Sequence, residues 1–162
     1  MLMFRPMVRQ NKQLTKDVCI QILRQQNRGV LSVNGDDGYP YSAPINHYYN
    51  PDDGCLYFHT GRRTDSHRTE SLRASDKVCY CVTEPGKPIP GDWALFVRSV
   101  VVFGRVEIID DVEQILPVCA ALSRQFTKDE AFIQKELDRF ARGTYLLKLT
   151  PEHICGKQVE EK

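Results

Sequence analysis

Hydrophobic residues near the start of the chain follow the period of a helix. Apolar side chains recur at helical spacing over 18–23, directly after Thr15, a residue type that often caps helices. Gly29 then offers a C-terminal stop. The pattern predicts an amphipathic helix from Thr15 to the region of Gly29 as the first element.

The next part of the chain has the composition of strands separated by tight turns. Two sequences rich in asparagine, aspartate and glycine, at 34–38 and 50–54, interrupt runs of β-branched and aromatic residues. Pro40 and Pro44 make the strand between those turns irregular or place it at a sheet edge. Gly104 is expected to bend the longest strand. The predicted strands are 30–33, 39–49, 55–60, 77–83, 93–109 and 144–149, with a further short strand near His153.

Two longer helices are predicted in the second half of the chain. Asp110 and Glu113 resemble a capping box that opens a helix through Phe126, and Pro117 is expected to kink or split that helix. Another helix is predicted over 128–142, and its apolar residues share one face. These residues are Phe132, Ile133, Leu137 and Phe140.

Many short strands at turn-marked intervals, with helices at the periphery, indicate a mainly β fold. The expected architecture is a small β-barrel with peripheral helices. A chain of 162 residues with 41% hydrophobic residues can form one domain that buries roughly 70% of its unfolded surface. We therefore predict a single domain over 1–162, in which 1–13 form an N-terminal extension.

Charge and cysteine content narrow the function classes. A formal net charge of +1 gives no electrostatic case for nucleic-acid binding. No apolar run approaches the roughly 18 residues that cross a bilayer, and the N-terminus is too short for a signal peptide, so we expect a cytoplasmic protein without a membrane partner. The six cysteines lie among apolar residues, and their only close pair is Cys79 and Cys81. They are predicted to be reduced core thiols rather than a metal site.

The most informative local sequence is the end of the strand 55–60. Hydroxyl and basic residues follow it, and a short helix is expected to begin at Asp65 or Ser66 and run through Arg73. A helix N-terminus carries unpaired N–H groups and a partial positive charge, so this segment predicts a phosphate-type anion site. A solvated basic loop before an ordinary capped helix is the alternative. The side chains that would serve the anion are Thr60, Arg62, Arg63, Ser66, His67 and Arg68.

Several catalytic classes lack their motifs. The chain contains neither a Walker sequence nor a Gly-x-Gly-x-x-Gly after a strand. Asp65, Ser66 and His67 are sequence neighbours, which seldom point at one another as a hydrolase triad must. His47 and His59 lie near strand ends without a third ligand at regular spacing, so a polar or ligand-facing role is expected rather than metal binding.

Seven sequence blocks occur in a recognisable order between about Leu14 and Gln158. They are 28–33 (RGVLSV), 38–46 (GYPYSAPIN), 56–60 (LYFHT), 67–68 (HR), 77–80 (KVCY), 98–104 (RSVVVFG) and 156–158 (GKQ). In this order they resemble the pyridoxamine 5′-phosphate oxidase-related FMN-binding proteins. Within this family the chain most resembles the branch that contains the 5-nitroimidazole resistance (Nim-like) proteins.

The resemblance implies a split β-barrel that forms a homodimer and holds FMN at the subunit interface. Backbone groups of 44–46 would border the isoalloxazine ring, and His59 and Thr60 would lie beside the ribityl-phosphate region. His67 and Arg68 would hold the phosphate. With the anion site and two candidates from the second subunit, Ser99 and Val100, the expected cofactor-binding residues are Pro44, Ile45, Asn46, His59, Thr60, Arg62, Ser66, His67, Arg68, Ser99 and Val100.

The phosphate loop departs from the family pattern. Relatives often have a glycine and a lysine around the phosphate-binding histidine, whereas this chain has Ser66 before His67 and Arg68 after it, in a slightly longer loop. An arginine can bind phosphate, even bidentately, but its reach differs from that of lysine.

These expectations lead to an FMN-dependent oxidoreductase acting on a small electron acceptor such as a nitro compound, with His59 as the candidate catalytic residue. The apolar strand 93–104 is expected to form the homodimer surface. Two alternatives remain open. The chain could be a flavin carrier without turnover, or a barrel with a changed ligand such as haem, with His47 or His59 as the axial ligand.

Overall fold

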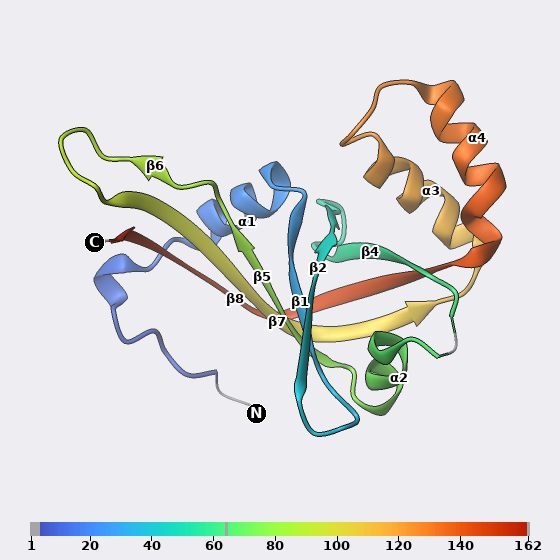
Figure 1. Cartoon of the computed structure of the whole chain (residues 1–162), viewed down its shortest axis with the longest axis horizontal. Coiled ribbons are helices and arrows are strands. Elements are labelled where there is room, and N and C mark those ends of the chain that lie inside the picture. Colours follow the sequence, from blue (N-terminus) through green and yellow to red (C-terminus); the bar gives the residue numbers. More distant parts are fainter. Residues whose placement is uncertain (1–3, 64, 162) are drawn as a thin grey trace.

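The computed structural model describes residues 4–63 and 65–161. It consists of one antiparallel sheet that curls into a split barrel, with helices at its ends and on part of its outer face (Figure 1). The strands are β1 (Arg28–Asn34), β2 (Pro40–Asn46), β3 (Tyr48–Tyr49), β4 (Leu56–Gly61), β5 (Lys77–Thr83), β6 (Lys87–Pro88), β7 (Leu95–Ile109) and β8 (Thr144–Glu161). The fold class predicted from the sequence is confirmed.

The strand order is β2-β1-β5-β7-β8-β4-β3, and the short β6 pairs with β7. The two edges of this sheet are β2 and β3, so the prediction that the proline-containing strand lies at an edge is confirmed. The curl of the sheet brings β2 into contact with β4, although no ladder of hydrogen bonds joins these strands. This unpaired seam is the split of the barrel.

The longest strands pair with each other across a bend. A register shift separates Phe103 from Gly104 on β7, and Gly104 faces Pro151 of β8 there. A Cβ at Gly104 would lie 2.2 Å from the carbonyl oxygen of Thr150, so the strands approach each other too closely for any other residue. The predicted bend at Gly104 is confirmed. The prediction of two separate final strands is wrong, since β8 continues through Pro151. Pro151 lies opposite the register shift, where the pairing is already irregular, so its missing N–H does not end the strand.

Four α-helices and two 3₁₀ turns complete the described chain. The first helix begins after Thr15 as predicted, and the Thr15 hydroxyl accepts a hydrogen bond from the Val18 N–H. It ends at Gln25, so the stop predicted near Gly29 is wrong. Gly29 lies in β1, where a Cβ would meet the Cys81 carbonyl oxygen at 2.4 Å. The helices are α1 (Lys16–Gln25), α2 (His67–Ala74), α3 (Val112–Ser123) and α4 (Glu130–Phe140), with η1 (Gln10–Lys12) and η2 (Ala141–Gly143).

Helix α3 differs from its prediction in its N-cap residue and in the effect of its proline. Its N-cap is Asp111 rather than Asp110, because the Asp111 carboxylate accepts from the Glu113 N–H at 3.0 Å. Pro117 lies inside a single helix instead of splitting it. Proline has no N–H, so Pro117 cannot donate the helical hydrogen bond to the carbonyl of Glu113. Both residues are exposed to solvent, where water can bond that carbonyl instead.

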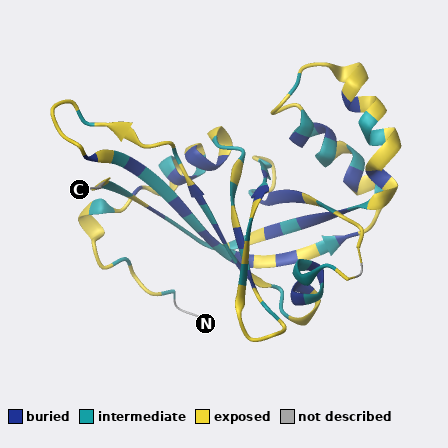
Figure 2. Ribbon diagram, in the orientation of Figure 1, coloured by how far each residue is buried: buried dark blue, intermediate teal, exposed yellow. Residues whose placement is uncertain are grey.

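Two apolar clusters hold the structure together (Figure 2). The main core fills the barrel, and α1 and α2 contribute Ile22, Leu23 and Leu72 to it. A smaller cluster lies on the outer face, where Ile115 of α3 packs near Tyr57 of β4. Of the apolar residues predicted to share one face of the last helix, only Ile133 is buried, because α4 packs on α3 rather than on the sheet (Figure 1).

All six cysteines are free thiols. Cys19 and Cys55 are buried, and the other four are half-buried. Among the described residues, no helix is long and apolar enough to span a membrane.

Candidate functional site

The predicted anion site lies where β4 leads into α2. Ser66 occupies the N-cap position in an extended conformation, but its side chain makes no capping hydrogen bond. The first helical hydrogen bond runs from the Glu70 N–H to the Ser66 carbonyl oxygen, at 3.0 Å. The three residues before Glu70 form the start of α2. The N–H groups of the first turn are therefore available to a ligand. Of the two predicted helix starts, Asp65 and Ser66, the structure has Ser66.

Four buried polar atoms on α2 lack a hydrogen-bond partner within the described chain. They belong to a guanidinium, an imidazole and two hydroxyls, and no other such side-chain atom is found in residues 4–63 and 65–161. Leaving a buried polar group unpaired costs about 1–3 kcal/mol, so four on one eight-residue helix indicate that a polar ligand or water completes the site. The atoms are His67 Nε2, Arg68 Nε, Thr69 Oγ1 and Ser71 Oγ.

This donor set fits a phosphate group. A guanidinium, hydroxyls and free backbone N–H groups all donate, and a phosphate oxygen only accepts. Thr69 and Ser71 were missed by sequence reasoning, since a serine and a threonine inside a helix carry no signal of their burial. Their exposed fractions are 1% and 0%.

The neighbouring arginines of the loop are engaged elsewhere. Arg62 forms an ion pair with Asp110, donates to the Asp110 carbonyl oxygen at 3.1 Å, and lies over the Tyr145 ring. Arg63 pairs with Asp65 on the surface at 3.2 Å. The structure thus brings His67 and Arg68 together at the helix start and holds Arg62 against the junction of β7 and α3.

The predicted isoalloxazine border lies along the end of β2, next to the split. Pro44 is exposed, Ile45 points into the core, and Asn46 accepts a hydrogen bond from the Arg28 guanidinium at 3.2 Å. Because β2 contacts β4 across the split, this segment and the end of β4 flank the same seam.

His47 is a structural residue of the core. It is fully buried, and its Nδ1 lies 2.7 Å from the Tyr80 hydroxyl while Nε2 lies 2.8 Å from the Leu23 carbonyl oxygen. Burial lowers the pKa of this imidazole below its usual value. Both ring nitrogens are engaged, so the axial-ligand role considered for His47 would require breaking two buried contacts.

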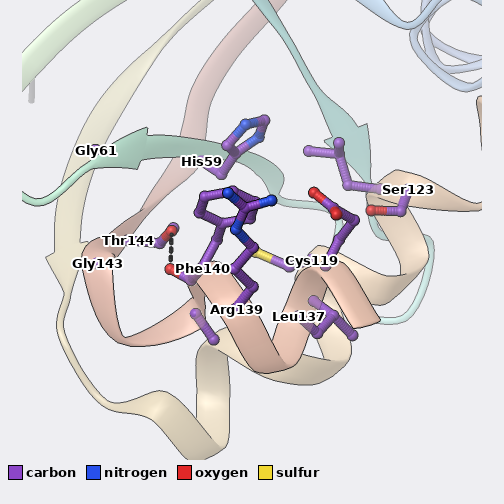
Figure 3. A pocket seen from close by; sticks show the side chains of 12 residues that line it. His59, Gly61, Cys119, Ser123, Leu137, Arg139, Phe140, Gly143 and Thr144 are labelled. Carbon is purple, nitrogen blue, oxygen red and sulfur yellow. Dashed lines mark hydrogen bonds between the residues drawn. The ribbon is translucent and has the colours of Figure 1, made fainter. Parts of the chain in front are cut away.

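His59 lies at the wall of a pocket of about 460 Å³ between β4 and the α3–α4 hairpin. Figure 3 shows its imidazole above Phe140 and Arg139, and Thr144 closes the rim through a 2.9 Å hydrogen bond to the Phe140 carbonyl oxygen. The side chain is partly exposed, yet desolvation by the pocket lowers its pKa. The ring is therefore neutral at pH 7.

The other side chains at this pocket are mostly uncharged or apolar. Cys119 of α3 faces it, and burial raises the thiol pKa to about 11, so this cysteine is protonated at neutral pH and is a weak nucleophile. Thr60, the next residue after His59, points to the opposite face of β4 and is half-buried.

Ser99 and Val100 lie on β7 at the far end of the sheet from α2. Val100 is buried in the barrel, while Ser99 is half-buried and opposes Thr83 of β5. Helix α2 ends just before Lys77, six strand residues from Thr83, which is about 20 Å. These two residues therefore lie at the end of β5 that is opposite to the C-terminal end of α2.

A curled antiparallel sheet with an open seam and a polar helix start beside it is the architecture of the split β-barrel proteins. The sequence model of the pyridoxamine 5′-phosphate oxidase family matches residues 15–158, and the chain belongs to this family. None of the curated proteins matches the sequence.

Solved structures share the fold at low identity. A candidate 5-nitroimidazole antibiotic resistance protein from Bacteroides thetaiotaomicron is 22% identical, with a TM-score of 0.77 over 92% of this chain and 87% of its own. A FAD-binding protein from Mesorhizobium loti is 23% identical, with a TM-score of 0.65 over 91% and 97%. A FAD and haem binding protein from Mycobacterium smegmatis is 20% identical, with a TM-score of 0.68 over 90% and 72%.

Proposed function

We propose that the chain binds FMN, with the phosphate at the N-terminus of α2 and the flavin ring along the seam between β2 and β4. The unpartnered buried atoms of Arg68, Thr69 and Ser71 carry this proposal, because they can donate hydrogen bonds and have no acceptor at the position where the sequence blocks predict the phosphate. Flavin binding by relatives of the same fold supports it.

A monophosphate suits this helix start. Arg68 supplies a full charge and the first turn of α2 supplies directional N–H donors, whereas the next charged side chains, Arg62 and Arg63, are paired with aspartates. We therefore propose FMN rather than the longer diphosphate of FAD as the preferred ligand.

We further propose that the protein is an oxidoreductase in which the pocket beside His59 receives a small electron acceptor, such as a nitro compound. When bound, the flavin supplies the electron-transfer chemistry. The neutral His59 keeps one ring N–H and one lone pair, so it can orient an acceptor by donating or accepting a hydrogen bond. Phe140 offers an aromatic surface to the acceptor, and the hairpin limits the access of water.

A homodimer is part of the proposal, because the outer face of the sheet remains half-exposed in one chain. A row of apolar or thiol side chains crosses five strands, each residue opposite the next. It consists of Pro44, Val30, Cys81, Val101 and Cys155. A second copy would cover this row and supply its own Ser99 and Val100 segment to the seam.

The expected homodimer strand needs one correction. Val100 and Val102 point into the barrel and belong to its core, and Val97 is buried as well, so these three residues are not available to a partner. Val101 and Phe103 are half-buried on the outer face, and Leu95 and the preceding Trp93 are exposed.

Titration of the flavin-free protein with FMN, riboflavin and FAD tests the ligand. We expect FMN to bind at least 10-fold more tightly than riboflavin, because charge-assisted hydrogen bonds to phosphate contribute about 1.5–3 kcal/mol each. Equal affinities for FMN and riboflavin would exclude a phosphate site on α2.

Steady-state assays then separate an enzyme from a carrier. NADH or NADPH oxidation by the FMN-loaded protein should require a nitroaromatic acceptor or another small oxidant. A protein that holds FMN but shows no turnover with any donor would be a flavin carrier. A Soret band with added haem, with no flavin binding, would instead favour the changed ligand, with His59 as the remaining axial candidate.

A further inference from the structure

The pocket beside His59 contains an arginine without an acidic partner. Arg139 of α4 lines this pocket, and within residues 4–63 and 65–161 its side chain forms neither an ion pair nor a hydrogen bond. Six other arginines of the described chain are each paired with a carboxylate, namely Arg62, Arg63, Arg73, Arg98, Arg105 and Arg124. The proposed acceptor site uses His59 and Phe140 and leaves the charge of Arg139 without a role.

An aromatic ring holds the guanidinium of Arg139 in place. Its Cζ lies over the Phe140 ring, 4.7 Å from the ring centre. A cation–π contact of this kind restricts the long side chain, and the planar guanidinium keeps its N–H donors for another partner. Figure 3 shows Arg139 and Phe140 together below the imidazole of His59. The charge is therefore positioned at the pocket rather than free in solvent.

The rest of the pocket suits the body of an aromatic ligand. Leu122, Leu137 and Phe140 line it, and its volume of about 460 Å³ is typical of small-molecule sites. Phe140 is 50% exposed, so a large part of its ring is available to a ligand. His59 makes no side-chain hydrogen bond within the described chain, so its neutral ring can bond an uncharged polar group of the same ligand.

One acidic residue also lines the pocket. Glu136 lies one turn before Arg139 on α4, is half-buried, and forms no ion pair with it. The two opposite charges cancel, so the pocket has no general attraction for anions. Recognition of an anion therefore needs direct hydrogen bonds from the Arg139 guanidinium. A second negative charge on the ligand would be repelled by Glu136.

We infer that the pocket beside His59 binds a small aromatic monocarboxylate, and that Arg139 determines this specificity. A planar carboxylate accepts two parallel N–H bonds from a guanidinium, while the ring of the ligand packs against Phe140. Binding of the carboxylate stands on the geometry of the pocket. Its use as an electron acceptor, for example as a nitroaromatic acid, rests on the proposed oxidoreductase function.

Calorimetric titration of the purified protein, with FMN added, tests the carboxylate contact. The wild type should bind benzoate at least about 10-fold more tightly than benzyl alcohol, because only benzoate accepts charge-assisted hydrogen bonds. Arg139→Met removes the charge but keeps an unbranched side chain beside Phe140, and it should bind both compounds with similar affinity. Arg142→Met is the matched control, since Arg142 is exposed two residues after Phe140 and does not line the pocket.

Two results of this titration would overturn the inference. The first is equal benzoate affinity in Arg139→Met and Arg142→Met, which would show that Arg139 does not hold the carboxylate. The second is a wild type that binds benzoate no more tightly than benzyl alcohol. Neither result depends on turnover, so both bear on the carboxylate site alone.

Steady-state assays with 4-nitrobenzoate and 4-nitrobenzyl alcohol test the link to the proposed function. The wild type and Arg142→Met should prefer 4-nitrobenzoate by about 10-fold or more in kcat/KM, and Arg139→Met should lose this preference. Turnover of both acceptors without a preference would contradict the assigned specificity and leave the oxidoreductase function intact. Benzoate binding that depends on Arg139, without turnover of any acceptor, would reject the oxidoreductase function and support the carboxylate site.

Discussion

At the scale of single residues, burial of polar atoms is the most informative property of this chain. The sequence predicts His67 and Arg68 at the helix start, and both lie there. It cannot reveal that Thr69 and Ser71 are buried without partners, because burial depends on how α2 packs against the barrel. It also cannot show that Arg62 pairs with Asp110, which is 48 positions away.

Replacement of Arg68 by alanine should weaken FMN binding about 10- to 100-fold, since it removes one charge-assisted contact to phosphate. Riboflavin affinity should not change, and the variant should remain folded. Arg63→Ala is the control, because Arg63 is exposed on the same loop and its side chain, within residues 4–63 and 65–161, pairs only with Asp65. An Arg68→Ala protein that binds FMN as tightly as the control would show that the phosphate lies elsewhere.

His47 should make stability fall in mild acid. Its pKa is lowered in the folded state, so as the pH falls below about 6.5 the unfolded chain takes up a proton that the folded chain does not. The free energy of unfolding should decrease by up to about 1.4 kcal/mol per pH unit in that range. Urea unfolding between pH 5 and 8 measures this slope.

The variant His47→Gln should reduce that slope and lower stability at pH 7.5 by about 2–4 kcal/mol, because the Tyr80 hydroxyl and the Leu23 carbonyl lose well-placed partners in the core. His59→Gln is the companion variant, since His59 also has a lowered pKa and adds its own part to the slope. A slope unchanged in His47→Gln would contradict the assignment.

At the scale of helices and strands, local sequence patterns predicted the type of most elements correctly. They predicted the residues at which elements begin and end less well. The 77–83 strand and the Thr15 cap follow directly from local pattern. The errors fall where tertiary contacts decide: Gly29 lies in β1 because of its neighbour on β5, and the last strand continues through Pro151 because of the irregularity opposite it. Pairing partners far apart in sequence are not encoded in local periodicity.

Gly104→Ala should destabilise the protein by about 1–3 kcal/mol, because the added methyl would overlap the Thr150 carbonyl and force β7 and β8 apart. Gly143→Ala is the matched control, since nothing lies within 4 Å of the position of its Cβ. Thermal unfolding of both variants provides the comparison. Equal melting temperatures would mean that the bend tolerates a side chain.

At the scale of the whole molecule, the split barrel itself could be predicted from the order of the sequence blocks. The sequence could not predict the pocket that the α3–α4 hairpin forms beside His59, because this pocket depends on the packing of α3 on the outer face of the sheet. It also did not place the β1–β2 turn next to α2.

A shared cofactor site predicts that FMN and dimerisation reinforce each other. If FMN binds across the interface, saturation at about 100 times its dissociation constant should stabilise the dimer by roughly 2.7 kcal/mol. Light scattering and sedimentation over a dilution series, with and without FMN, measure this shift. A monomer that binds FMN tightly would be incompatible with a shared site.

The position of β8 between β7 and β4 affects how the protein folds during its synthesis. The strand that β4 needs as its neighbour is the last one of the described chain, almost 90 residues later. At a synthesis rate of about 5–20 residues per second, a nascent chain would carry the apolar edge of β4 unpaired for roughly 5–20 seconds. During translation the barrel cannot close, so the emerging polypeptide exposes Leu56 and Phe58 to chaperones and to other nascent chains until β8 leaves the ribosome.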